Sequence, residues 1–408
     1  MACVFIVSIA VARFINWAIY NWAYSKSAFG PWAKAPKKFP AHTLQDHLPA
    51  IGWWRLRREA KAHTKTFWIR PMLLEIIFPV ACAWYYHFYV SGGALGARPL
   101  ALALQPELHT QFLGHYALFI LMAIATFIDF DEFSIPDYVT VPGAVIGIIG
   151  AAFAPAWLPM SFNFVGGDTL YLELLATTPL PAWLLTKKWS LIVATGIIIA
   201  WAAALQDRRW IGRRGLAKAL QYFFVKIGRN REVILFAACA SILMLIVCIW
   251  AVATNSPRVP YLLSSLIGLA FGGGITWGVR IAATWGLQIE ALGFGDVTLM
   301  AMIGAFIGWQ ASLLVFFIAP MLALGFAVVR WLTTGDIHSP YGPYLCGATV
   351  VVLVWWDALW NGWAGPVFVS LGGLVIVIVG TCIVMMGGML WVWRLIKQML
   401  GIDFYSNQ

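Results

Sequence analysis

The chain has 408 residues, of which 61% are hydrophobic and 11% charged, and its mean hydropathy is +0.80. This composition excludes a soluble globular domain, in which about a quarter of the residues are charged. Several apolar runs approach the roughly 20 residues that cross a bilayer, whereas a membrane β-barrel would show alternating hydrophobicity. The predicted fold class is all-α: a polytopic helical integral membrane protein with about 8–11 transmembrane helices.

Apolar runs predict helices throughout the chain. In chain order they are 2–24, 72–90, 115–128, 139–157, 189–205, 233–254, 261–279, 297–308, 310–332, 344–360 and 366–395. The first helix lacks the basic start and small-residue cleavage site of a signal peptide, so we expect it to be retained. The stretch 159–188 is typical of a loop, and GLAKALQYFFVKIG within 206–232 predicts a short amphipathic helix at the membrane surface.

The net charge of +10 is concentrated in two loops, 25–70 and 206–232. Short positive loops stay in the cytoplasm, so we expect both loops and the C-terminus inside and the N-terminus outside. Anionic lipid headgroups account for this charge more simply than nucleic acid does. We therefore expect membrane lipids as partners and no nucleic acid. The six cysteines form no CxxC pair, so neither a metal site nor a disulfide framework is expected.

Acidic residues gather at two places. The first is TFIDFDEFSIPDYVTVPG, with Asp129, Asp131, Glu132 and Asp137, and the second is IEALGFGD, with Glu290 and Asp296. In the predicted topology both clusters lie at the cytoplasmic ends of helices, at the same depth. The two clusters can therefore meet, although they are far apart in the sequence.

Two carboxylates that lie close together do not both ionise cheaply, so one acts as a base and the other as an acid. Such a pair activates water and polarises an amide carbonyl without a metal. Gly293 and Gly295 permit a close approach to Asp296, and Pro136 ends one helix before the next begins. An ion- or proton-coupled transporter also uses paired acids, usually near the membrane midplane, and stays open as an alternative.

Several ordered motifs resemble one known family, over residues 12–345. They are ARFINWAIY, DHLPAIGWWRLRRE with IRPMLLEI, FIDFDEFSIPDYVTVPG, EALGFGDVTLMAMIGAFIGW and HSPYGPYLCGA. They resemble the type IV prepilin leader peptidases, which are membrane aspartic proteases of the Gly-x-Gly-Asp type. Arg70 and Glu75 match an Arg and a Glu of the family's cytoplasmic loop.

The resemblance implies an aspartic endopeptidase of the bacterial inner membrane, with Asp129 and Asp296 as the catalytic pair. It would cleave the basic leader from type IV prepilins or type II secretion pseudopilins at the cytoplasmic face. Supporting residues would be Gly293, Gly295, Pro136, Asp131, Asp137 and Glu290. We expect Asp131, Glu132 and Asp137 to attract the basic leader, Glu132 above all. A non-catalytic scaffold for pilus or secretion assembly is a further alternative.

The resemblance also predicts how the chain is divided. Residues 1–90 form an N-terminal helix pair with the basic loop 25–70, residues 112–345 a peptidase core with an insertion at about 159–232, and residues 346–408 the C-terminal helices. Many members carry two CxxC pairs in the first loop, which is free of cysteine here, so zinc is not expected. Methylation with S-adenosylmethionine stays open, and proteolysis needs no cofactor. Thr298 stands where the family usually has Lys.

Overall fold

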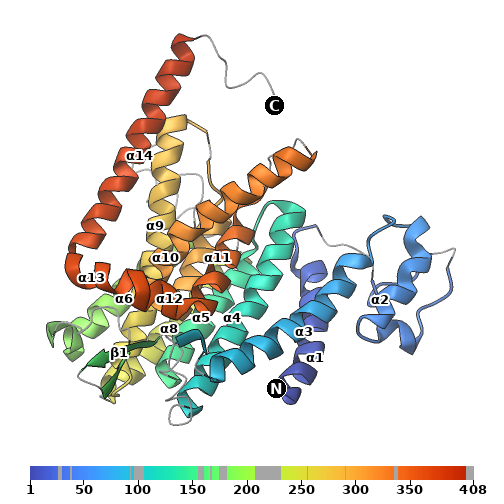
Figure 1. Cartoon of the computed structure of the whole chain (residues 1–408), viewed down its shortest axis with the longest axis horizontal. Coiled ribbons are helices and arrows are strands. Elements are labelled where there is room, and N and C mark those ends of the chain that lie inside the picture. The colour runs from blue at the N-terminus through green and yellow to red at the C-terminus, as the bar shows by residue number, and fades with distance from the viewer. Residues whose placement is uncertain are drawn as a thin grey trace.

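A computed structural model describes residues 1–25, 30–36, 39–91, 93–95, 105–154, 160–165, 168–173, 182–206, 231–254, 256–289, 291–334 and 339–400. These residues form a bundle of long helices (Figure 1). Seven of the described helices are long and apolar enough to cross a membrane. They are α1 (Ala2–Trp22), α3 (Ile69–Val90), α4 (Gln105–Glu132), α6 (Lys187–Gln206), α9 (Val259–Leu287), α10 (Phe294–Thr334) and α14 (Leu374–Met399). The predicted fold class, a multi-pass helical membrane protein, is confirmed.

The remaining helices are shorter or bent. α5 (Asp137–Phe153) and the stretch Ala237–Ala253 of α8 (Arg231–Ala253) are apolar but shorter than the spans above. The single predicted helix 344–360 is wrong, because α11 (Gly342–Val354) and the helical segment Trp356–Leu371 meet at 89°. That segment comprises α12 (Trp356–Leu359), a π-helical turn (Trp360–Ala364) and α13 (Gly365–Leu371). The buried indoles of Trp356 and Trp360 stack at 5.2 Å beside this bend.

Glycines shape the contact between α9 and α10. A Cβ atom on Gly268 would collide with the carbonyl oxygen of Gly304, and a Cβ on Gly304 would collide with that of Gly268. Such close backbone contact is how small residues pack membrane helices. Gly308 has φ 74° and ψ 176°, which breaks α10 where the sequence predicts two separate helices. The first part of α10 is thus a short, tightly packed helix.

The predicted loop 159–188 contains a β-hairpin, which is a correction to the sequence analysis. β1 (Met160–Val165) and β2 (Asp168–Glu173) pair antiparallel, with Met160 opposite Glu173 and Val165 opposite Asp168. The sequence between them is Gly-Gly, which favours a tight hairpin connection. The amphipathic helix predicted within 206–232 falls outside the described residues.

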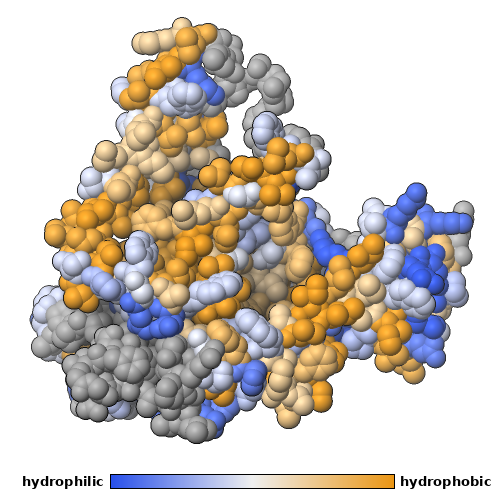
Figure 2. Space-filling view, viewed as in Figure 1, coloured by the Kyte–Doolittle hydropathy of each residue, from blue (hydrophilic) through white to orange (hydrophobic). Residues whose placement is uncertain are grey.

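A polar lobe projects from the bundle between α1 and α3, around α2 (Ile51–Leu56) (Figure 1). Figure 2 shows several hydrophilic patches on its surface, whereas most of the helical body is apolar. Inside the lobe, Asp46 accepts hydrogen bonds from Thr43, Arg55 and Arg58, with the two guanidinium nitrogens at 3.0 and 2.9 Å. Burial disfavours the charged carboxyl, but these donors outweigh it and hold the pKa of Asp46 well below its usual range.

Glu75 on α3 anchors this lobe to the bundle. Its buried carboxylate accepts hydrogen bonds from Asn16 of α1 at 2.9 Å, the Ala50 amide at 2.6 Å and the Trp53 indole at 2.9 Å. Arg13 lies 3.6 Å from the same carboxylate. A buried charge is tolerated only when it is paired and hydrogen-bonded in this way. Glu75 therefore joins α1, α2 and α3 at one point.

Candidate active site

Asp129 lies one turn before the end of α4, and its side chain is buried at 4% exposure. α4 ends at Glu132 because Phe133 adopts a left-handed conformation (φ 52°), with its amide donating to the Asp129 carbonyl at 2.9 Å. The chain then runs extended through Pro136 (φ −74°, ψ 142°) into α5. This turn leaves the Asp129 side chain facing the start of α11.

The first residue of α11 holds the Asp129 carboxylate. The Gly342 amide donates a hydrogen bond to Asp129 Oδ2 at 3.1 Å. A Cβ atom on Gly342 would lie only 2.6 Å from the same oxygen and 2.8 Å from Ile135 Cδ1. Any other residue would therefore displace the carboxylate or Ile135. The helix N-terminus also favours negative charge at this point.

Asp296 lies in the first turn of α10 and is 7% exposed. A Cβ atom on Gly293 would lie 3.3 Å from Asp296 Oδ2, and one on Gly295 would lie 3.0 Å from the Ile135 Cβ and amide nitrogen. The Gly-x-Gly-Asp turn therefore packs directly on the segment that follows Asp129. This is the close approach that the two glycines predict.

Three segments distant in sequence converge here. Ile135, which is 2% exposed, contacts both Gly295 and Gly342, so the starts of α10 and α11 lie against the end of α4. The carboxyl groups of Asp129 and Asp296 are near enough to interact electrostatically. Burial, reinforced by the charge of Asp296, raises the pKa of the Tyr341 hydroxyl, which places this phenol at the same site. The arrangement is a sheltered carboxyl pair bordered by a phenol.

The accompanying acids lie around this site in different roles. Asp131 forms a two-pronged ion pair with Arg70 of α3, with N–O distances of 2.5 and 2.8 Å. Glu132 accepts hydrogen bonds from the Tyr24 and Ser25 amides, at 2.9 and 2.6 Å, just after α1. Asp137 occupies the first turn of α5, where the helix dipole favours its charge. Glu290 falls outside the described residues. Asp131 and Glu132 thus tie the end of α4 to α3 and to the segment that follows α1.

Arg280 on α9 is a residue that the sequence analysis missed. Its Nε donates to the Leu292 carbonyl oxygen at 2.9 Å, immediately before Gly293. Its guanidinium lies 5.7 Å from the centre of the Phe294 ring, within the range of a cation–π contact. A lone cation in a long apolar segment is the signal that could have revealed it. Arg280 fixes the turn that carries Asp296.

A metal ion has no ready cluster of ligands in the part of the chain that the structure describes. Among the residues that it describes, no group of three His, Cys, Asp or Glu side chains is placed to hold an ion. In the polar lobe, His42 is already engaged with Glu59 at 2.9 Å, and the sequence of the basic loop contains no cysteine. The basic loop thus offers none of the thiolate donors that structural zinc sites use.

Comparisons with known proteins match one part of this chain. Residues 231–328 match the type IV leader peptidase family. The prepilin leader peptidase/N-methyltransferase of Aeromonas salmonicida is 31% identical over 98 residues, 23% of this chain and 34% of that protein. The leader peptidase HopD of Escherichia coli is 35% identical over 100 residues, 22% of this chain and 63% of that protein. No solved structure matches.

The family resemblance read from the motifs is confirmed over this matched segment. The segment contains the Gly-x-Gly-Asp turn with Asp296, whereas Asp129 and Gly342 lie outside it. The matches extend over about one third of the Aeromonas protein and less than two thirds of HopD. The assignment of Asp129 to the carboxyl pair therefore rests on its position in the fold and not on the matched segment.

Proposed function

We propose that this chain, whose residues 231–328 match the type IV leader peptidase family, is a membrane aspartic endopeptidase that removes leaders from prepilin-like substrates. The observation that carries the proposal is the convergence of Asp129 and Asp296 at the contact between α4, α10 and α11. Both residues are buried, at 4% and 7% exposure, where α4 ends and α10 begins.

The chemistry follows from the pairing of two carboxyls. Like charges held close together favour a state in which one carboxyl keeps its proton. The ionised carboxylate takes a proton from water as that water attacks the peptide carbonyl, and the protonated one donates a hydrogen bond to the developing oxyanion. The proton taken from water then passes from its carboxyl to the leaving amine, and the C–N bond breaks. The oxyanion collapses to the new carboxyl group, and the pair returns to its starting state with one proton. The Gly342 amide fixes the orientation of Asp129 throughout.

The names of the relatives and the charges around the site support a substrate with a basic leader. Asp131 is neutralised by Arg70, while Glu132 and Asp137 lie beside it at the end of the bundle. Glu132 accepts hydrogen bonds from two backbone amides, and these partners carry no counter-charge. We propose that Glu132, with Asp137, steers the leader toward the pair, whereas the ion pair with Arg70 removes Asp131 from the steering that the sequence suggested. The substrate would be a prepilin or a type II secretion pseudopilin.

The positive loops support an orientation with the N-terminus outside and the site at the cytoplasmic face of a bacterial inner membrane. Proteolysis by this pair needs no cofactor. Methylation of the new N-terminus with S-adenosylmethionine is a separate activity, which mass spectrometry of the product would detect. The proposed division into an N-terminal domain, a core at 112–345 and C-terminal helices at 346–408 keeps the three converging segments within the core.

Co-expression with a prepilin tests the proposal, with leader removal followed by gel shift. We expect Asp129→Asn and Asp296→Asn to abolish cleavage while membrane insertion is retained. Asp357→Asn is a matched control, because Asp357 lies on α12, where its carboxylate accepts a hydrogen bond from the Asn361 side-chain amide at 2.5 Å. Cleavage by either site variant would contradict the assignment. Prepilin binding without cleavage by the wild type would indicate a scaffold, and proton- or ion-driven flux in liposomes would indicate a transporter.

A separate test addresses the leader. Glu132→Gln should raise KM mainly at low salt, because attraction between exposed charges is screened as ionic strength increases. The same substitution should leave kcat unchanged. If salt changes KM neither in the wild type nor in Glu132→Gln, steering by Glu132 is contradicted.

A further inference from the structure

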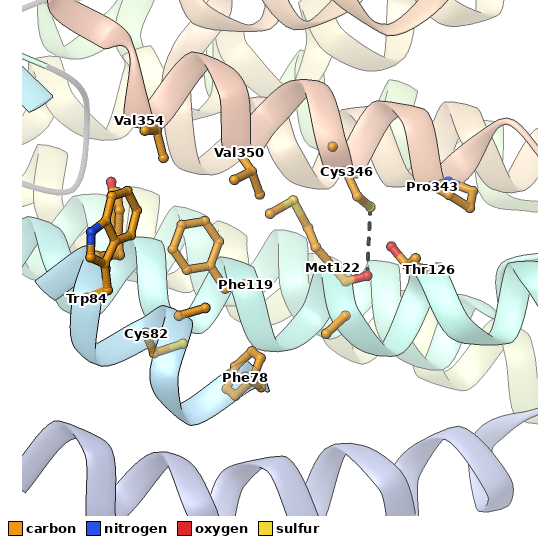
Figure 3. A pocket seen from close by; sticks show the side chains of 14 residues that line it. Phe78, Cys82, Trp84, Phe119, Met122, Thr126, Pro343, Cys346, Val350 and Val354 are labelled. Atoms are coloured by element: carbon orange, nitrogen blue, oxygen red, sulfur yellow. Dashed lines mark hydrogen bonds between the residues drawn. The ribbon is translucent and has the colours of Figure 1, made fainter. Parts of the chain in front are cut away.

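A cavity of about 360 Å³ lies between α3, α4 and α11 (Figure 3). Thr126 and Pro343 lie at one end, and Trp84 and Val354 lie at the other (Figure 3). Its lining is almost entirely apolar. Trp84 is 51% exposed and Val350 40% exposed, so the cavity opens toward the surface that faces lipid. We call it the α4–α11 groove.

The groove leads into the candidate active site. Phe119, Met122 and Thr126 line it from α4, and Asp129 follows at the same helical spacing, so all four share one face of that helix. On the other wall, Pro343 directly follows Gly342, whose amide binds the Asp129 carboxylate. The groove therefore ends beside Asp129.

Small side chains keep the groove open. Gly347 lines it from α11, and a Cβ atom there would meet only Leu322 Cδ1, at the ordinary separation of 3.6 Å. Cys346 also lines it, and its thiol lies 3.7 Å from the Met122 carbonyl oxygen (Figure 3). The space is thus bounded by well-packed helices and remains free for an apolar group.

We propose that the α4–α11 groove binds the first turns of the substrate's apolar helix, on the carboxyl side of the bond that is cut. This inference rests on the proposed function. An apolar lining would reject a basic leader, because burial of an unpaired charge is costly. A groove that opens to lipid and ends beside Asp129 matches a helix that lies in the bilayer and continues into a scissile bond. Docking there would hold that bond at the carboxyl pair, and such positioning accelerates reaction.

Filling the groove tests the proposal. The full chain is reconstituted in liposomes with a synthetic peptide that joins a basic leader, through Gly, to an apolar helix. Gly347→Leu should raise KM about tenfold with kcat unchanged, because it displaces roughly one buried apolar side chain of the peptide. Gly196→Leu, on an exposed face of α6 with no atom within 4 Å of its Cβ position, is the matched control.

Photo-crosslinking gives a second readout that does not need turnover. A photoreactive residue at Val350, inside the groove, should form an adduct with the apolar part of the peptide. The same residue at Val369, 86% exposed on α13, should not. A wild-type KM in Gly347→Leu, together with no peptide adduct from position 350, would overturn the proposal. The groove would then be a site for lipid chains. If wild type cleaves no peptide, the proposed function fails, and the Val350 adduct still decides whether the groove binds the helix.

Discussion

The contact between Gly342 and Asp129 allows a sharp test of the site. In Gly342→Ala the new Cβ would lie 2.6 Å from Asp129 Oδ2, so the carboxylate must move by about 0.8 Å to reach an ordinary 3.4 Å contact. A misplacement of about 1 Å can cost roughly 100-fold in rate, so we expect kcat to fall about 10- to 100-fold. The steric conflict should cost about 1–3 kcal/mol. The better helix propensity of Ala returns up to about 1 kcal/mol of that loss.

Leader cleavage kinetics and thermal unfolding in detergent separate these effects. Gly347→Ala is the matched control, because it makes the same change on the same helix where the added Cβ has room. We expect the control to keep wild-type kcat and unfolding temperature. Wild-type kcat in Gly342→Ala would refute the argument that the Gly342 amide sets the position of the Asp129 carboxylate.

Three further predictions concern residues outside the carboxyl pair. Arg280→Ala removes the hydrogen bond to the Leu292 carbonyl, so kcat should fall about tenfold with KM unchanged in cleavage assays; a rise in KM alone would argue against a positioning role. Glu75→Ala should lower the free energy of unfolding by about 3–5 kcal/mol in detergent, because its buried donors lose their acceptor; a loss below about 1 kcal/mol would contradict this. The stability of the polar lobe should be complete above about pH 4 and decline as the pH falls below that value, because the pKa of Asp46 is lowered by folding. Limited proteolysis of the lobe should show this decline in the wild type, and Asp46→Asn should lack it.

The sequence predicted the positions of Asp129 and Asp296 because an acid at the end of an apolar helix is costly, and such residues are few. The break in α10 was also predictable, since Gly308 interrupts an apolar run. A meeting of the two acidic clusters was expected from the topology, but the contact that the start of α11 makes with Asp129 was not. Gly342 lies in a motif that looks ordinary in sequence, and its importance comes from a carboxylate more than two hundred residues away.

Other features depended on contacts that a single sequence does not display. The 89° bend after α11 occurs within an apolar run that could equally form one straight helix, and packing of Trp356 on Trp360 accompanies it. The hairpin in 159–188 had a usable signal, a Gly-Gly pair between alternating residues, which the high overall hydrophobicity obscured. Arg280 was overlooked because its partner is a backbone carbonyl, which every residue has.

The contact between Asp129 and Gly342 also sets an order of events during biosynthesis. α4 emerges from the ribosome long before α11, and the Asp129 carboxylate has no Gly342 amide to bind until α11 has entered the membrane. A partly synthesised chain therefore holds both aspartates before it holds a complete site. In the function proposed above, proteolytic competence would therefore arise only late in translation.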